Sequence, residues 1–345
     1  MAKRNTDGTY WDCHDLLTRN GMFNFAIGGR GTGKTYDAKY KRIKHFLKTG
    51  KRFIYLRRYK TEFEDKDKFF SDIVDNFPEH EFDVRGMTGF IRPASDEEKN
   101  PHKWEPLCYF VTLANALTKK SVPYPDVDMI IFDEFIIDKG SLHYCSNEVK
   151  QFLDFYNTVD RFEDRCRVLF LANAVTLTNP YFIYWKLKPR KEKRFCSAAG
   201  GTVVCEMVQS EKFRAKVDQT KFGQLIKGTA YYDYAVGNSF RDDNDSFIAK
   251  KTEEAQFYYA IKFDGRSVGI WVDYEEGNYY VCGKIPKNAR VITLTKDDMQ
   301  PNLVMIERNS VYMRSLKRMY MQGSVFFDSI ETREFTHSIL SYLGL

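Results

Sequence analysis

The chain has 345 residues, 43% of them hydrophobic and 29% charged, and carries a formal net charge of +6. This length is sufficient for two domains with hydrophobic cores, and no apolar run approaches the roughly 18 residues that a membrane-spanning helix requires. The polar N-terminus does not resemble a secretory signal, and the seven scattered cysteines include no C-x-x-C pair. We therefore expect a cytoplasmic protein with reduced cysteines, no zinc site and no membrane partner.

Over the first two-thirds of the chain, short apolar runs alternate with amphipathic segments. This alternation predicts an α/β fold with a mostly parallel sheet. Strands are predicted at residues 23–27, 52–56, 107–113, 129–132 and 168–172. Helices are predicted to begin at Lys34 and to occupy residues 62–77 and 148–159, the last with apolar residues at helical spacing.

The last third of the chain has a different texture. After residue 195 the pattern weakens and turn signals become frequent, which indicates a linking segment. Three alternating runs joined by Asp264-Gly265 and Gly277-Asn278 then predict an antiparallel meander, followed by helices over residues 302–321 and 332–343. We expect three parts, which are an N-terminal domain over 1–208, a linker subdomain over 209–250 and a C-terminal α+β domain over 251–345.

The segment NFAIGGRGTGKTY, residues 24–36, matches G-x-x-x-x-G-K-[ST] between a predicted strand and a predicted helix. Glycines let backbone N–H groups turn toward phosphate oxygens, while the lysine reaches the β- and γ-phosphates and the hydroxyl binds Mg²⁺. A turn that only joins strand to helix is the weaker explanation. The predicted ATP-binding residues are Gly28, Gly29, Arg30, Gly31, Thr32, Gly33, Lys34 and Thr35.

A second motif, DMIIFDEF at residues 128–135, is a buried strand that ends in two acids. Its end meets the sheet edge where the P-loop lies, so the Asp133 carboxylate can hold Mg²⁺ together with Thr35. Glu134 points differently and can take a proton from an attacking water. Kinases of small molecules generally do not need this second acid, because their acceptor is a bound hydroxyl, so the pair favours hydrolysis over phosphotransfer. Ordinary surface acids at a strand end are the weaker explanation.

Polar residues also follow or precede the next buried strand, VLFLANA at residues 168–174. Asn173 can contact the γ-phosphate or the lytic water, although a capping role at a strand end is equally compatible. Upstream, DRFEDRCR contains Arg161, Arg165 and Arg167. An arginine finger from a neighbouring subunit is one role for such residues, and an ordinary surface position is the other.

The predicted strand RFIYLRRYK, residues 52–60, interleaves aromatic residues with cations as it runs toward solvent. Its end lies beside the P-loop strand, so Arg57, Arg58 and Lys60 can reach a subunit interface or nucleic acid. We count Arg57, Lys60 and Arg165 as candidates for DNA or interface contacts. Residues 1–60 hold 15 Lys/Arg against 4 Asp/Glu, and this basic excess indicates a polyanionic partner.

Acidic residues of the C-terminal part are candidates for a two-metal nuclease site, which requires several converging carboxylates. The set comprises Asp264, Asp273, Glu275, Glu276 and Asp328. Most of them lie in or next to predicted tight turns, where acids are common. Ordinary turn acids are therefore the favoured interpretation.

Taken together, the motifs resemble the genome-packaging motor ATPases of small tailed bacteriophages of the phi-29-like kind. The resemblance rests on GGRGTGKTY, FIYLRRYK, YPDVDMIIFDEF, TVDRFEDRCRVLFLANAVTLTNPYF and GIWVDYEEG, and it spans nearly the whole chain. It implies a P-loop ATPase domain of the additional-strand, conserved-glutamate class. It also implies a short linker subdomain and a C-terminal RNase H-like domain that has lost its catalytic acids.

The resemblance also implies roles for individual residues. Lys34 and Thr35 match the P-loop of the family, and Asp133 and Glu134 match its metal-binding and catalytic acids. Three further positions match the trans-acting arginine finger, an interface or DNA-contacting lysine, and a sensor asparagine. They are Arg161, Lys60 and Asn173, and Arg30 also fits the loop pattern of the family.

The expected function is therefore ATP-driven translocation of double-stranded DNA, with ATP and Mg²⁺ as cofactors. A homo-oligomeric ring, expected to be a pentamer, would act on the portal of an empty capsid in the host cytoplasm and leave before the virion matures. Whether a packaging RNA takes part stays open. The alternatives are a nuclease-bearing terminase, a small-molecule phosphotransferase, and a nucleotide-gated DNA-binding module without turnover.

Overall fold

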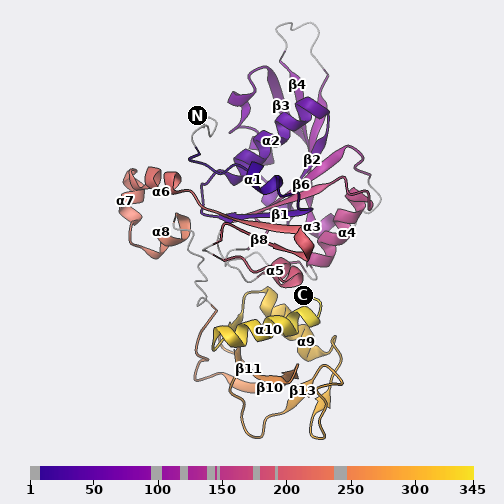
Figure 1. Ribbon diagram of the computed structural model, residues 1–345, viewed down its shortest axis with the longest axis vertical. Helices are drawn as coiled ribbons and strands as arrows, with labels where there is room; N and C mark the ends of the chain where they lie inside the picture. The colour runs from indigo at the N-terminus through magenta and orange to yellow at the C-terminus, as the bar shows by residue number, and fades with distance from the viewer. Residues whose placement is uncertain are drawn as a thin grey trace. The chain divides into compact units, whose positions relative to one another are not determined.

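The structure is a computed structural model that describes residues 8–94, 103–116, 123–137, 144–145, 148–173, 179–190, 193–236 and 247–345. The chain divides into two compact units, one formed by residues 1–137, 147–175 and 187–240 and the other by residues 138–146, 176–186 and 241–345 (Figure 1). Within the described ranges, no helix has both the length and the apolar character that crossing a bilayer requires. The division into three parts at residues 208 and 250 stays a prediction.

The first unit is built on a nine-stranded sheet of order β3-β4-β5-β2-β6-β7-β1-β9-β8. Neighbouring strands from β5 through to β9 run parallel, whereas antiparallel pairs lie at both edges. The predicted mostly parallel α/β sheet is thus confirmed. The strands are β1 (Phe23–Gly28), β2 (Arg52–Arg57), β3 (His80–Arg85), β4 (Thr88–Pro93), β5 (Glu105–Thr112), β6 (Val127–Asp133), β7 (Arg167–Asn173), β8 (Phe195–Ala198) and β9 (Val203–Val208).

All five strands predicted for this sheet are present, because continuous apolar runs are typical of strands buried on both faces. The hairpin of β3 and β4 was not predicted. The sequence of β3, HEFDVR, has no continuous apolar run, and every residue of this strand is at least partly exposed. Edge strands of this kind are half solvated and hide their period-2 signal among charges.

Helices of this unit include α1 (His14–Leu17), α2 (Lys34–Thr49), α3 (Leu113–Ala116) and α4 (Glu148–Asp160). The predicted start of α2 and the extent of α4 are confirmed. The helix predicted over residues 62–77 is wrong, since short 3₁₀ turns at Lys60–Phe63, Lys66–Lys68 and Val74–Asn76 take its place. Lys39 Nζ on α2 donates to the Phe69 carbonyl, which an α-helix would use internally.

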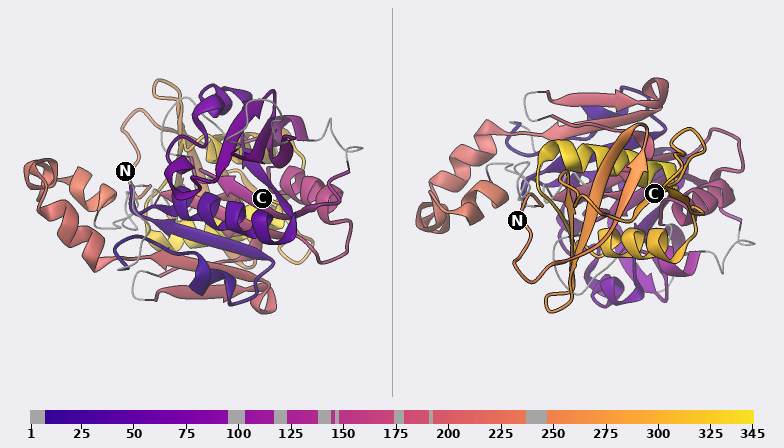
Figure 2. Two further views of the ribbon diagram at one scale, coloured as in Figure 1. Left: turned by 90° about the horizontal axis from the view of Figure 1, so that it is seen from above. Right: turned by 90° about the horizontal axis from the view of Figure 1, so that it is seen from below.

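After β9 come three short helices, α6 (Glu211–Asp218), α7 (Lys221–Ile226) and α8 (Ala230–Ala235). Each begins at a hydroxyl residue whose side chain accepts a backbone N–H in the first turn, which satisfies one free donor of the helix end. The cap residues are Ser210, Thr220 and Thr229. Figures 1 and 2 show the three helices as a cluster to one side of the sheet.

The second unit contains a six-stranded sheet of order β14-β13-β10-β11-β12-β15. The predicted antiparallel meander is confirmed in β10, β11 and β12, and parallel pairings attach the other three strands. The strands are β10 (Gln256–Phe263), β11 (Arg266–Asp273), β12 (Asn278–Cys282), β13 (Val291–Thr293), β14 (Val304–Met305) and β15 (Val325–Phe327).

Helices α9 (Val311–Met321) and α10 (Ile330–Tyr342) contact this second sheet, and α5 (Pro180–Trp185) packs on α10. The helix predicted over residues 332–343 is confirmed. That predicted over 302–321 is wrong in its first half, because residues 304–305 pair with β13 and the helix begins only after its cap, Ser310.

Candidate nucleotide site

The predicted phosphate-binding loop lies between β1 and α2, at the carboxyl edge of the parallel strands. Gly31 and Gly33 have φ angles of 78° and 85°, which disfavour any residue with a Cβ. A Cβ at Gly28 would lie 2.6 Å from Val208 Cβ on the neighbouring strand. The glycines therefore allow both the turn of the loop and the close packing of β1 on β9.

Lys34 is the first residue of α2 and is buried in this loop. Its Nζ donates to the carbonyl oxygens of Gly29 at 2.8 Å and Gly28 at 3.2 Å, and to Thr32 Oγ1 at 3.2 Å. Burial lowers the pKa of Lys34 to about 8, while the Asp133 carboxylate acts in the opposite direction. A phosphate beside this ammonium would favour its charged form and replace the carbonyl contacts.

The residues expected to hold Mg²⁺ are brought together from distant parts of the chain. Thr35 Oγ1 donates to Asp133 Oδ2 at 3.0 Å, and Tyr55 on β2 also donates its hydroxyl hydrogen to this carboxylate oxygen. A hydroxyl and a carboxylate oxygen at this spacing suit a hard cation that prefers oxygen ligands. The donor set therefore fits Mg²⁺.

Glu134 directly follows β6 and adopts a left-handed φ of 55°. Its Oε2 lies 2.8 Å from Nη2 of Arg57, whose Nη1 is 3.7 Å from Asp133 Oδ2. Arg57 also pairs with Glu62. The predicted interface or DNA role of Arg57 stays a prediction, but its side chain lies among the acids of this site, which the sequence did not indicate.

Arg58 and Lys60 differ in their surroundings. The idea that Arg58 reaches an interface is wrong, because its side chain is 1% exposed and its Nε lies 2.7 Å from Glu148 Oε2. Its Nη2 also donates to the Phe135 carbonyl at 2.7 Å, just beyond Glu134. Lys60 is exposed at the start of a 3₁₀ turn, and its role stays a prediction.

The Arg58–Glu148 pair is expected to stabilise the unit that carries the site. Glu148→Ala should lower the free energy of unfolding by about 3–5 kcal/mol, because it leaves a buried guanidinium without its carboxylate. Urea denaturation followed by far-ultraviolet circular dichroism measures this change. Glu331→Ala, which removes an exposed ion pair with Arg266, is the matched control and should stay within about 0.5 kcal/mol. Equal effects of the two variants would contradict this prediction.

Asn173 is the last residue of β7 and is aligned with Gly28 of the P-loop strand. The parallel register thus places Asn173 at the carboxyl ends of the strands, where the phosphate-binding loop also lies. This position is compatible with the predicted contact to the γ-phosphate or water.

Arg161 and Arg165 lie in what we call the finger loop, residues 161–165. This loop directly precedes β7, so it lies at the amino ends of the parallel strands, whereas the P-loop lies at their carboxyl ends. The Asp160 carboxylate anchors this loop by accepting backbone N–H groups of residues 164, 165 and 166 at 2.9–3.1 Å. Arg161 is exposed. Arg165 instead donates to backbone carbonyls, including that of Val127 at 2.7 Å, so its guanidinium faces the protein.

A pocket of about 450 Å³ lies beside the finger loop, at the amino ends of β1, β7 and β9. Arg167 lines it and joins the loop to the turn before β1, with Nη1 donating to the Asp164 carbonyl and Nη2 to Asn20 Oδ1. These contacts fix the finger loop at the edge away from the P-loop.

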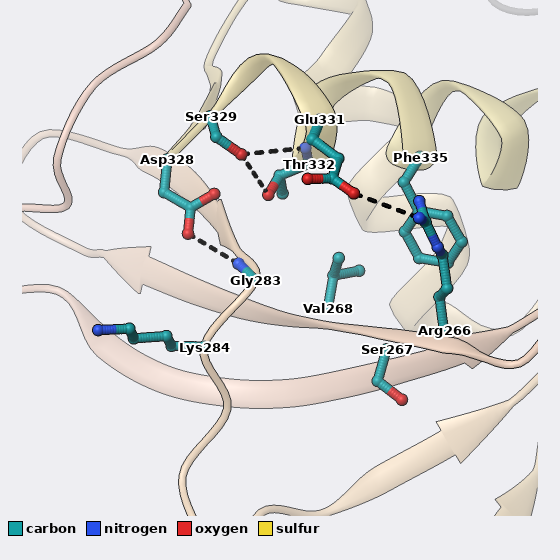
Figure 3. Close-up of a pocket in the computed structure, with 10 residues that line it drawn as sticks. All are labelled: Arg266, Ser267, Val268, Gly283, Lys284, Asp328, Ser329, Glu331, Thr332 and Phe335. Atoms are coloured by element: carbon teal, nitrogen blue, oxygen red, sulfur yellow. Dashed lines mark hydrogen bonds and ion pairs between the residues drawn. The ribbon is translucent and has the colours of Figure 1, made fainter.

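The candidate nuclease acids do not converge. Among the described residues, the only group of three potential ligands with atoms within 4.8 Å of one another is Asp12, Cys13 and Asp37, none of them C-terminal. Asp273 accepts backbone N–H groups of Glu275 and Glu276, as expected for a turn acid. Asp328 lines a pocket of about 380 Å³ in the second unit, where it accepts from the Gly283 N–H at 2.8 Å (Figure 3).

A mostly parallel sheet with a P-loop lysine, a hydroxyl–carboxylate pair and an adjacent glutamate defines a P-loop ATPase. The chain belongs to a particular family of this class, the podovirus DNA encapsidation proteins (Gp16), whose model matches residues 6–343.

Solved and curated relatives agree with this membership. The chain is 34% identical over 333 residues to the DNA packaging protein of Bacillus phage phi29, with 96% of both chains covered. It is similar to a chain of the phi29 viral genome packaging motor assembly, at 33% identity and a TM-score of 0.61, with 97% of this chain and 99% of that chain covered. The N-terminal domain of the phi29 DNA packaging ATPase matches with 35% identity and a TM-score of 0.53, over 59% of this chain and 98% of that domain.

Proposed function

We propose that this chain is an ATP-driven double-stranded DNA translocase that packages a viral genome into a preformed capsid. The observation that carries the proposal is the assembly of Lys34, Thr35, Asp133 and Glu134 at one sheet edge in a member of the DNA encapsidation family. The phi29 relatives are a packaging protein and part of a packaging motor assembly, which supports DNA and a portal as partners.

In this proposal each residue of the site has one task. Lys34 neutralises the β- and γ-phosphates. Thr35 and Asp133 would hold Mg²⁺, which would supply further charge neutralisation when bound. The Glu134 carboxylate accepts a proton from the water that attacks the γ-phosphorus, and ADP leaves on the opposite side. Arg57, 2.8 Å from Glu134, orients this carboxylate. Asn173 contacts the γ-phosphate or the water.

The position of Arg161 favours action in trans. The finger loop precedes β7, whereas Asn173 and the P-loop lie at the far end of the same strands. Six residue steps along β7 span about 20 Å, so Arg161 is too far to reach the P-loop of its own chain. In a head-to-tail ring, Arg161 of one subunit can meet the nucleotide of the next.

The finer features of the assembly belong to the same proposal. The ring is a pentamer on the portal of the procapsid in the host cytoplasm and is absent from the mature virion. Lys60 and the basic N-terminal half contact the DNA backbone or a neighbouring subunit. A packaging RNA between motor and portal is compatible with the chain but has no residue assigned to it.

The second unit is proposed to be a vestigial RNase H-like domain that contacts nucleic acid or the portal. Its meander continues beyond β10 into the parallel strands β13 and β14, an arrangement typical of RNase H-like sheets. The alternative of a nuclease-bearing terminase is less well supported, because among the described residues no three of the candidate acids bring their ligand atoms together, and Asp273 and Asp328 accept backbone N–H groups.

Phosphate release with and without long double-stranded DNA, over a salt series, tests the proposal. We expect DNA to raise the rate and the stimulation to fade as salt rises, because contacts to the phosphate backbone release counterions. A rate that ignores DNA at every salt concentration but requires a small-molecule acceptor would instead indicate a phosphotransferase. ATP binding without any phosphate release would indicate a nucleotide-gated binding module.

A further inference from the structure

The finger loop has an unusual backbone. Arg161, Phe162 and Asp164 have φ angles of 56°, 60° and 51°, a region that residues with side chains rarely occupy. Such conformations persist only where the surrounding structure enforces them, and they gather at functional sites. Here the buried Asp160 carboxylate enforces them through three backbone N–H groups. The loop is therefore held in one shape.

This fixed loop presents a large aromatic side chain to solvent. Phe162 is 88% exposed, which is more than any other large apolar residue among those the structure describes. A single exposed apolar residue is common on protein surfaces. Phe162 differs because it sits directly beside Arg161 on a loop whose backbone is strained and anchored by Asp160.

A second apolar surface lies on the helices that follow β9. We call it the α7 patch, and it consists of Phe222, Leu225 and Tyr231, which are 58%, 77% and 41% exposed. The rings of Phe222 and Tyr231 have their centroids 6.2 Å apart. Leu225 follows Phe222 by three residues on α7, a spacing that places both on one face of the helix. The three side chains therefore offer exposed apolar surface of the kind that protein contacts use.

The α7 patch belongs to the P-loop side of the unit. The Ala235 carbonyl at the end of α8 accepts the backbone N–H of Arg30 within the P-loop at 3.0 Å. On α6, the Phe213 ring lies 3.4 Å from the position that a Cβ on Gly31 would take. The patch therefore lies toward the carboxyl ends of the parallel strands, and the finger loop lies at their amino ends.

We propose that Phe162 of one subunit packs on the α7 patch of a second copy of this chain, and so sets the register that brings Arg161 to the nucleotide. This inference rests on the proposed ring and its trans-acting arginine. Two different surfaces of one chain that fit each other make a head-to-tail contact, and such a contact gives a ring when the rotation between neighbouring subunits closes.

The charges around the two surfaces agree with this pairing. Glu163 and Asp164 directly follow Phe162, and both are exposed. Lys221 and Lys227 flank Phe222 and Leu225 along the chain, and both are exposed as well. Glu163 already pairs with Arg165 at 3.0 Å, and Lys227 already pairs with Asp218 at 3.0 Å. The complementarity therefore rests on Asp164 beside the inserted ring and Lys221 beside the patch, whose opposite charges favour correct docking.

A charge exchange across the contact tests the proposal. Phe162→Lys and Leu225→Glu should each raise the concentration for half-assembly by a factor on the order of ten or more, because each places a charge in an apolar contact. The chain with both changes should recover most of the assembly, since every interface then pairs one lysine with one glutamate. Sedimentation velocity of the full chain with ATP and Mg²⁺ measures this, and Tyr274→Lys, at a 69% exposed tyrosine of the other unit, is the matched control.

A crosslink gives an independent measurement. Chains with Phe162→Cys mixed with chains with Leu225→Cys should form a covalent dimer with a short bismaleimide, whereas either chain alone should not. If both single charge variants have the wild-type concentration for half-assembly, or if the double variant shows no recovery, the pairing of Phe162 with the α7 patch is overturned while the proposed ring stands. A wild-type chain that stays monomeric would overturn the ring itself. Loss of DNA stimulation with oligomers intact would place DNA, and not a neighbouring chain, on Phe162.

Discussion

Replacing Glu134 by Gln is expected to preserve ATP binding and to lower ATP turnover by a factor on the order of 10²–10⁴. The amide keeps the shape of the side chain and can still accept a hydrogen bond from Arg57, but it cannot take a proton from water. The proposed phosphate contacts come from Lys34 and the loop, and Lys34 has no hydrogen bond to Glu134 that the change would remove. Phosphate release and equilibrium binding of a fluorescent ATP analogue measure the two quantities separately.

Glu105→Gln is the matched control for this variant. Glu105 is an exposed glutamate at the first residue of β5, at the amino edge of the same sheet, and its replacement should leave both quantities unchanged. Turnover by Glu134→Gln within about tenfold of the wild-type rate would remove Glu134 from the role of general base. Loss of ATP binding together with turnover would show that the side chain supports the site structurally.

Mixing two inactive variants is expected to restore ATPase activity. Arg161→Ala should lower turnover by a factor on the order of 10³ or more, because an arginine finger stabilises charge on the transferring phosphoryl group. Lys34→Ala should lose activity through its own P-loop. In a random mixed ring about a quarter of the interfaces join an intact P-loop to an intact finger from the neighbouring chain. Phosphate release over a series of mixing ratios measures the recovery.

Chains that carry both changes provide the control for mixing. Added to either single variant, they supply oligomers but no interface with both intact groups, so activity should stay absent. Recovery in the first mixture alone would show that lysine and arginine act from different subunits. Mixed oligomers that form and remain inactive would contradict a trans-acting Arg161 and direct attention to the other arginines of this region.

Several parts of this protein could be predicted because their signals are local. A buried parallel strand reads as an apolar run, and the glycines between β1 and α2 reveal a loop whose backbone must turn where side chains cannot. The meander of β10 to β12 is evident from alternation and from Asp-Gly and Gly-Asn turns. The P-loop, Asp133 and Glu134 could be recognised in the same way, because their chemistry lies in short contiguous motifs.

Local signals failed where distant contacts compete with them. A helix is predicted over residues 62–77, but Lys39 on α2 takes the Phe69 carbonyl, and 3₁₀ turns replace the helix. Arg57 and Arg58 are neighbours in an apparently solvent-directed run, yet one lies among the acids of the site and the other is buried against Glu148. Which carboxylate a cation meets depends on the strand order, and that order is not encoded in either residue's surroundings along the chain.

The sequence alone therefore determined the class of protein and the alternation of strands and helices, and it identified the candidate phosphate-binding and acidic residues. The tertiary structure decided that Tyr55 and Thr35 share the Asp133 carboxylate, and that Arg161 lies at the far edge of the sheet. It also decided that Phe162 and the α7 patch are exposed. The physical reason is that strand pairing joins residues far apart in the chain, so edges, burial and reach exist only once the sheet has formed.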